Sequence, residues 1–164
     1  MTITFRPALM PQDAPLLAEL FVNSVLELGA EDYGEAELSA WAALADDEDA
    51  FATRLAPLLT LIAFVKGEEA GFVSLKDNAV IEMLYVSPDY ATKGVGTALV
   101  HAVETLANHR GAAKLTVDAS DMAEPLFKKL GYTAQRRNTV DLGGVWLGNT
   151  TMTKTLSEPE TGSA

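Results

Sequence analysis

The segment Ile81–Leu99, IEMLYVSPDYATKGVGTAL, constrains the fold more than any other part of the sequence. It begins with an apolar run typical of a β-strand, which Pro88 ends because proline has no N–H for a sheet ladder. Gly94 and Gly96 follow, and the apolar residues after them recur at the spacing of an amphipathic helix. The first N–H groups of a helix have no internal partner and lie at its positive end. The segment therefore predicts a loop that binds a phosphate or pyrophosphate.

Composition bounds the class of protein. With 164 residues and 48% hydrophobic content, the chain is expected to form one domain over residues 2–156, with a flexible tail at 157–164. No run approaches the roughly 20 apolar residues of a membrane helix, and the N-terminus lacks the layout of a signal peptide, so we expect a cytoplasmic protein. The absence of cysteine excludes disulfides and thiol-ligated metals, and no metal site is predicted. The net charge of −11 argues against nucleic acid and suits a cationic substrate.

Hydrophobic periodicity predicts an alternation of strands and helices. Strands are expected at Thr2–Pro7, Leu59–Val65, Ala70–Leu75, Val80–Val86, Lys114–Asp118, Tyr132–Arg137 and Val145–Thr155. Helices are expected between Asp13 and Gly29, at Glu35–Ala45, from the glycine loop to Asn108, and at Ser120–Leu130. Short loops predict antiparallel pairing of the second to fourth strands, and the helix after the glycine loop predicts a parallel crossover to the fifth.

Local signals add detail at the helix ends. Asp13 is predicted to cap the first helix, and Asp121 with Glu124 to cap the helix after the fifth strand. The acidic segment Asp46–Arg54 is predicted to be a last helical turn or a loop.

Two motifs in this order resemble those of the GCN5-related N-acetyltransferases, the GNAT family. Leu84–Gly96, LYVSPDYATKGVG, resembles the acyl-CoA loop of that family, and Ala123–Tyr132, AEPLFKKLGY, resembles its second signature. The resemblance extends over residues 2–156. It implies an α/β fold, classed as α+β in some schemes, with a mixed, mostly antiparallel sheet of about six or seven strands that is splayed at its centre and flanked by about four helices.

The resemblance also implies a cosubstrate, acetyl-CoA, and the residues that hold it. Backbone groups of Leu84 and Val86 would face the pantetheine arm, and the glycine loop would wrap the pyrophosphate. Ser120 and Phe127 would flank the end of the arm near the thioester. The cofactor-binding residues implied in this way are Leu84, Tyr85, Val86, Ala91, Thr92, Lys93, Gly94, Val95, Gly96, Thr97 and Phe127.

Two positions depart from the family pattern. Ala91 stands where relatives usually carry Gln or Arg, although Lys93 can still supply a positive charge. Phe127 stands where many relatives carry a tyrosine that protonates the departing thiolate, which phenylalanine cannot do. Because a thiol pKa of about 8.5 makes the thiolate a fair leaving group, the missing acid is tolerable, or its task falls to Ser120, Tyr85, Tyr132 or water.

Acetyl transfer to an amine needs a base, because only the neutral amine attacks. Glu82 is our candidate: it is a carboxylate inside an apolar strand, two residues before Leu84, and burial would raise its pKa into a useful range. The alternative is a carboxylate at a strand edge or paired with a lysine. Ser120 is the second predicted catalytic residue. Tyr33 and Trp41 are expected either to line the acceptor side or to pack in the core.

The resulting hypothesis is an acetyl-CoA-dependent N-acetyltransferase that acts on a small amine, an amino acid or a peptide N-terminus by direct attack on the thioester. The alternative, motivated by Ala91 and Phe127, is a catalytically degenerate member that binds acyl-CoA or a protein partner. Neither a nucleic acid nor a membrane is expected as a partner, and a homodimer is compatible with the resemblance. A dinucleotide site fits poorly, because Leu99 stands where that fingerprint has Gly or Ala.

Overall fold

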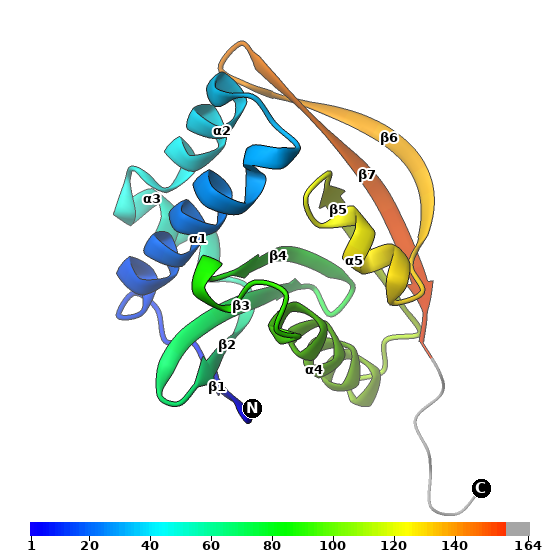
Figure 1. Cartoon of the computed structure of the whole chain (residues 1–164). Helices are drawn as coiled ribbons and strands as arrows, with labels where there is room; N and C mark the ends of the chain where they lie inside the picture. The colour runs from blue at the N-terminus through cyan, green and yellow to red at the C-terminus, as the bar shows by residue number, and fades with distance from the viewer. Residues whose placement is uncertain (157–164) are drawn as a thin grey trace, which may run out of the picture.

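Seven strands form one mixed sheet in the order β1-β2-β3-β4-β5-β7-β6 in the computed structural model, which describes residues 1–156 (Figure 1). The strands are β1 (Ile3–Pro7), β2 (Leu59–Val65), β3 (Glu68–Lys76), β4 (Val80–Val86), β5 (Lys114–Ser120), β6 (Thr133–Leu142) and β7 (Val145–Thr155). All neighbours pair antiparallel except β4 and β5, which are parallel. The mixed, mostly antiparallel sheet confirms the predicted fold. The predicted tail at 157–164 lies outside the described residues.

Within residues 1–156, five α-helices flank the sheet, one more than expected from the sequence. They are α1 (Ala14–Leu28), α2 (Glu35–Ala42), α3 (Glu48–Leu55), α4 (Val95–His109) and α5 (Glu124–Lys129), with short 3-10 helices at Gly29–Glu31, Ala43–Ala45 and Pro88–Tyr90. Within the described residues, none of these helices has both the length and the apolar composition needed to cross a membrane.

The acidic segment Asp46–Arg54, predicted as a last helical turn or a loop, forms most of a separate helix, α3, instead. The Asp47 carboxylate caps it by accepting the N–H of Ala50 at 3.1 Å. Phe51 and Leu55, four residues apart, are fully buried. The acidic composition of the segment hid this short apolar face, which is what gives the helix its packing energy.

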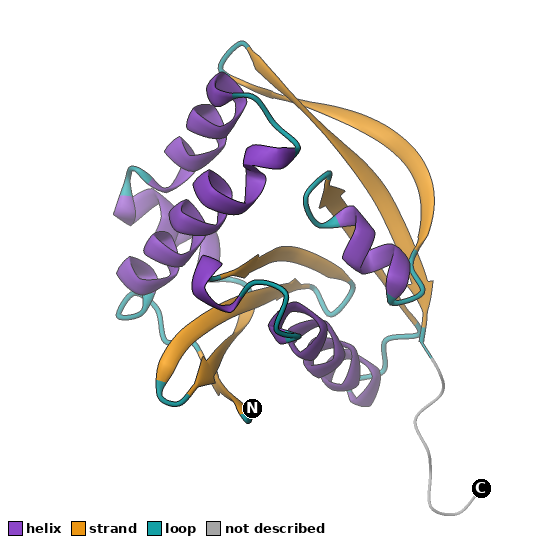
Figure 2. Ribbon diagram, in the orientation of Figure 1, coloured by secondary structure: helices purple, strands orange, loops and turns teal. Residues whose placement is uncertain are grey.

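The two faces of the sheet carry separate hydrophobic clusters. Neighbouring residues of β3 illustrate this, because Phe72 packs with α1, α2 and α3 whereas Val73 packs with α4 and α5. Figure 2 shows the long β6–β7 hairpin arching over the molecule, with its turn near α2. The centre of the sheet is therefore enclosed by α1, α2 and α3 from the N-terminal part of the chain and by the β6–β7 hairpin from its C-terminal part.

The centre of the sheet is splayed, as the resemblance implied. β4 and β5 pair at only two positions, Val80 with Thr116 and Ile81 with Val117. Beyond these positions β4 continues along β3, and β5 continues along β7. Figure 1 shows α1, α2 and α3 on one side of this divergence and α5 with the β6–β7 hairpin on the other.

Two predicted caps are wrong. The strand β5 runs on to Ser120, and the Oγ of Ser120 accepts the N–H of Ala123 at 3.1 Å. The Asp121 carboxylate, expected to cap α5, is paired with the Arg137 guanidinium instead. A long-range ion pair has therefore replaced the local hydrogen bond that the sequence pattern indicated.

Asp13 occupies the N-cap position of α1, but its side chain makes no cap hydrogen bond. Its carboxylate accepts Nη1 of Arg6 at 2.8 Å and the backbone N–H of Leu9 at 2.7 Å. It therefore fastens β1 to the start of α1 rather than closing the first turn of the helix.

The Asp13 contacts predict a pH-dependent contribution to stability. The hydrogen bond from Arg6 is the main cause that lowers the pKa of Asp13. A carboxyl whose pKa is depressed by folding stabilises the protein above its unfolded pKa, and this contribution is lost as the pH falls through the folded value. Asp13→Asn should therefore lower the free energy of unfolding at pH 7, by less than about 1 kcal/mol because the pair is partly solvated.

Urea unfolding at pH 7 and at pH 3 measures this effect. The difference between Asp13→Asn and the wild type should narrow at the lower pH, and Asp46→Asn, at an exposed carboxylate, should show little change at either. A difference of the same size at both pH values would contradict the assignment.

Candidate functional site

The loop between β4 and α4 is shaped by two glycines with different physical roles. Gly94 has φ of +83°, a left-handed conformation that side chains other than glycine rarely adopt, and nothing crowds it. Gly96 is required by space, because a Cβ there would lie 2.9 Å from Cδ2 of Leu126. The N–H of Ala98 is the first to bond back into α4, to the carbonyl of Gly94 at 3.0 Å. The N–H groups just before it therefore have no acceptor within the helix.

These N–H groups border a groove of about 520 Å³ between α1, the loop and α5. We call it the loop groove. It is lined by Ser24, Leu28, Leu84, Val86, Tyr90, Ala91, Thr92, Gly94, Val95, Gly96, Thr97, Met122, Ala123, Pro125, Leu126 and Lys129. Of the residues expected to hold the cofactor, it brings together all but Tyr85, Lys93 and Phe127. Lys93 is exposed, with its ammonium 5.9 Å from the centre of the Tyr90 ring.

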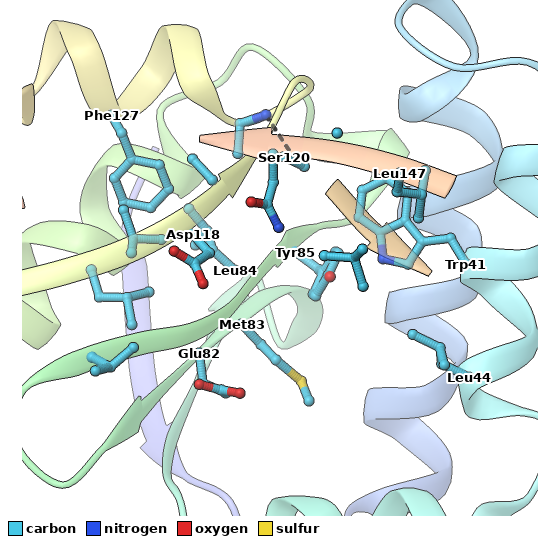
Figure 3. A pocket seen from close by; sticks show the side chains of 18 of the residues that line it. Trp41, Leu44, Glu82, Met83, Leu84, Tyr85, Asp118, Ser120, Phe127 and Leu147 are labelled. Carbon is cyan, nitrogen blue, oxygen red and sulfur yellow. Dashed lines mark hydrogen bonds between the residues drawn. The ribbon is translucent and has the colours of Figure 1, made fainter. Parts of the chain in front are cut away.

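A second cavity of about 310 Å³ lies where β4 and β5 diverge, and we call it the central cavity (Figure 3). Helices α2 and α3, β4, β5, α5 and the β6–β7 hairpin all contribute to its wall. Tyr33, Trp41, Glu82, Tyr85, Ser120 and Phe127 all line it, so it gathers the predicted catalytic and acceptor residues. Leu84 and Ala123 line both this cavity and the loop groove, which places the two spaces side by side along β4.

Glu82 is the extra residue of a β-bulge. Ile81 pairs with Leu75 and Met83 pairs with Ser74, so Glu82 has no partner on β3. Strict alternation along the strand is interrupted there, and the side chain is directed into the central cavity (Figure 3). Glu82 is exposed rather than buried, which corrects the burial expected from its apolar neighbours. Within residues 1–156 it forms no ion pair, so the lysine pairing considered from the sequence does not occur.

A second carboxylate, missed in the sequence, faces the same cavity. Asp118 on β5 follows Val117, the last residue paired with β4, as Glu82 follows Ile81. Both side chains are exposed and both line the central cavity (Figure 3). Asp118 accepts the hydroxyl of Thr151 at 2.6 Å, and that hydroxyl accepts Nδ2 of Asn138 at 2.8 Å. The Asp118 carboxylate is therefore held in place by the β6–β7 hairpin.

Three aromatic side chains, Tyr33, Trp41 and Tyr85, also line the central cavity. The Tyr33 hydroxyl donates to the carbonyl of Gly148 at 3.0 Å and accepts the N–H of Asp121 at 2.8 Å. Its ring lies 5.3 Å from that of Trp41, which in turn lies 6.1 Å from that of Tyr85. Desolvation raises the pKa of Tyr33 and raises the pKa of Tyr85 to about 12, so both hydroxyls keep their protons near neutral pH.

The structure distinguishes the three side chains considered as replacements for the missing acid, Ser120, Tyr85 and Tyr132, by where they lie. Phe127 is buried, with its ring 5.0 Å from that of Tyr132. The Tyr132 hydroxyl donates to Glu104 at 2.7 Å, and burial together with this bond raises its pKa. Tyr132 does not line the central cavity, whereas Ser120 and Tyr85 do.

Sequence reasoning also missed Arg54, Leu44, Val140, Leu142 and Leu147, which complete the cavity wall. Arg54 lies in the segment predicted to be a last helical turn or a loop, and the hairpin residues lie mostly beyond the predicted end of the sixth strand. Trp146 is exposed and lies outside the cavity. His101 and His109 line neither space.

Comparisons with known proteins agree on one family. A model of the acetyltransferase (GNAT) domain matches residues 29–156. The N-acetyltransferase YafP of Escherichia coli (strain K12), described as uncharacterized, is 30% identical over 139 residues, which are 85% of this chain and 87% of that protein. A GCN5-related N-acetyltransferase from Rhodopseudomonas palustris is 54% identical with a TM-score of 0.91, over 95% of this chain and 97% of that one.

A more distant structure shows how widely the fold is shared. The PaiA N-acetyltransferase of Thermoplasma acidophilum, solved in complex with coenzyme A, has a TM-score of 0.75 at 22% identity. The match covers 94% of this chain and 99% of that chain. At this identity the likeness shows the fold alone.

The two hydrogen bonds of Tyr33 predict a stability effect. Tyr33→Phe would leave the Gly148 carbonyl and the Asp121 N–H unpaired at the cavity wall, and should lower the free energy of unfolding by about 1–3 kcal/mol. Tyr90→Phe is the matched control, because that hydroxyl bonds Glu68 at the surface, and we expect a change within about 0.5 kcal/mol. Urea unfolding of both variants provides the measurement, and equal effects would show that Tyr33 does not fasten the wall.

Proposed function

The chain belongs to the GNAT acetyltransferase family, and from this we propose that it transfers an acetyl group from acetyl-CoA to a primary amine. The observation that carries the proposal is the adjacency of the two spaces, which share Leu84 and Ala123. An extended ligand with an anionic end and a reactive end could lie with the first at the glycine loop and the second in the central cavity. Acyl-CoA has this shape.

The loop groove suits the cosubstrate because it has hydrogen-bond donors for the phosphates and an unobstructed path for them. Free N–H groups at the start of α4 suit the pyrophosphate, and Gly96 keeps Cβ atoms away from it. Lys129 lines the groove and Lys93 lies at its edge, so positive charge is available although Ala91 offers none. Leu84 and Val86 lie on the part of β4 that pairs with β3 but no longer with β5, and the backbone groups on the freed edge are available to the pantetheine arm.

The reaction needs two proton transfers. In the proposed mechanism the acceptor enters as an ammonium, loses one proton to Glu82 directly or through water, and attacks the thioester carbonyl. The C–N bond forms and the C–S bond breaks. Asp118, held by Thr151, attracts and orients the ammonium. The second amine proton leaves as the amide forms, and it balances the proton taken up by the departing sulfur.

Ser120 is the residue we propose to assist the departing sulfur. Its Oγ accepts the N–H of Ala123, which leaves its own hydrogen to be donated into the cavity. Tyr85 also lines the cavity with its proton retained, since its pKa is raised to about 12. Much of the rate enhancement would come from holding amine and thioester together.

The acceptor is expected to be a small amine, an amino acid or a peptide N-terminus. Two carboxylates in the cavity favour a positively charged acceptor, and Arg54 at its wall could receive an acceptor carboxylate. The alternative, a member that binds acyl-CoA or a partner without catalysis, rests on Phe127 and Ala91. The cytoplasmic location and a homodimer stay predictions from the sequence.

Binding of acetyl-CoA tests the proposal first. Isothermal titration should show that the wild type binds acetyl-CoA and that Gly96→Leu weakens binding at least about 100-fold, because the new side chain fills the path of the pyrophosphate. Gly34→Ala, at an ordinary φ of −76° and away from the groove, should bind normally. Circular dichroism and thermal melting establish that each variant is folded. Absence of wild-type binding at millimolar acetyl-CoA would overturn the proposal.

Steady-state kinetics distinguish the proposed roles of Glu82 and Asp118. A thiol-detecting assay across a panel of amines should show kcat of Glu82→Gln reduced by about 100-fold or more, because the base is lost. Asp118→Asn should chiefly raise KM for a cationic amine. Glu27→Gln, exposed on α1 and outside both spaces, should match the wild type. Binding of acetyl-CoA without turnover of any amine would favour the non-catalytic alternative.

A further inference from the structure

One wall of the loop groove contains a buried hydroxyl with no partner. Ser24 on α1 is 1% exposed, and its Oγ forms no hydrogen bond with any of the described residues. The other buried side-chain polar atom in this condition within residues 1–156 is Oδ1 of Asn78. The amide nitrogen of Asn78 is already bonded to the carbonyls of Ala107 and Arg110 at the end of α4, so that side chain has a structural role.

The condition of Ser24 is unusual for a serine inside a helix. Such hydroxyls commonly bond the carbonyl one turn earlier, and no such bond forms here. Burying a hydroxyl without a partner costs free energy, so unpaired hydroxyls in native proteins need an explanation. Leu28, one helical turn further along α1, also lines the groove. Ser24 therefore lies on the face of α1 that is turned toward the groove.

The surroundings of Ser24 indicate what kind of group it would bind. Away from the glycine loop, the groove is lined largely by apolar side chains such as Leu28, Leu84, Val86 and Met122. The free N–H groups of the loop and the ammonium of Lys129 provide the donors for anions. A neutral hydroxyl one helical turn from the apolar Leu28 is suited to an uncharged polar group, which it can meet as donor or as acceptor.

We propose that the Ser24 hydroxyl binds an amide of the pantetheine arm of acyl-CoA. This rests on the proposed function, because it assumes that the arm lies in the loop groove. The arm is an apolar chain interrupted by amide groups, and the groove is an apolar channel with a buried hydroxyl in its wall. The first helix thus contributes a polar contact to a ligand whose other predicted contacts come from β4, the glycine loop and the β5–α5 region.

The proposal predicts opposite effects on the free and the bound protein. Ser24→Ala removes an unsatisfied hydroxyl, so the melting temperature of the free protein should stay unchanged or rise. The same change removes a hydrogen bond to the ligand, so binding should weaken by about 3- to 10-fold, the range for one neutral hydrogen bond. A serine with a purely structural role would lower the melting temperature instead.

The experiment compares three ligands on the wild type and on Ser24→Ala. Acetyl-CoA and coenzyme A contain the pantetheine arm, whereas adenosine 3′,5′-bisphosphate lacks it and is measured by competition with coenzyme A. The variant should lose affinity for the first two and keep its affinity for the third. Ser39→Ala, at an exposed serine on α2, is the matched control and should alter neither affinity nor melting temperature.

Three results would overturn the proposal. Unchanged affinity for acetyl-CoA would show that Ser24 makes no contact, and an equal loss for adenosine 3′,5′-bisphosphate would place Ser24 at the phosphates. A lower melting temperature of the free variant would indicate a structural role. Failure of the wild type to bind acetyl-CoA is a separate outcome, because it would overturn the proposed function itself.

Discussion

The parting of β4 from β5 after Ile81 and Val117 is the constraint on which the site depends. Backbone groups in a sheet are normally paired on both sides, and β4 keeps its pairing with β3 while it loses β5. The bulge at Glu82 lies at this point and directs the Glu82 carboxylate toward the gap between β4 and β5. The freed edge of β4, the central cavity and the placement of Glu82 and Asp118 in its wall are therefore consequences of one local break in pairing.

This geometry places the groups that suit an anionic cosubstrate apart from those that suit a cationic acceptor. The chain has a net charge of −11, yet the proposed cosubstrate is strongly anionic. Backbone N–H groups at the start of α4 address that problem, because their dipoles favour a phosphate without changing the net charge. The carboxylates at the other end of the site suit a cationic acceptor instead. Because these two sets of groups lie at different places along β4, one protein can bind both an anionic cosubstrate and a cationic acceptor.

Features encoded by neighbouring residues were predictable, and features created by register were not. The glycine loop, the strand before it and the helix after it follow from residues adjacent in the chain. Asp118 was missed because its place beside Glu82 depends on a parallel register that no local pattern states. Tyr33 bonds a carbonyl 115 residues away, and Asp121 pairs with Arg137 instead of capping α5. The expected burial of Glu82 was wrong because the splay opens that part of the strand.

The environment of Phe127 bears on how the departing sulfur would be protonated. Its ring packs nearly perpendicular to the Tyr132 ring. The Tyr132 hydroxyl donates to Glu104, and Glu104 accepts Nζ of Lys154 at 3.0 Å. Moving the Tyr132 hydroxyl to the cavity would break this partly buried chain of hydrogen bonds and leave Glu104 with Lys154 alone. Tyr132 is therefore not placed to supply the acid that the family resemblance implies for a tyrosine at position 127. In the proposed reaction a donated proton must come from the other side of the cavity, where Ser120 and Tyr85 lie, or from water.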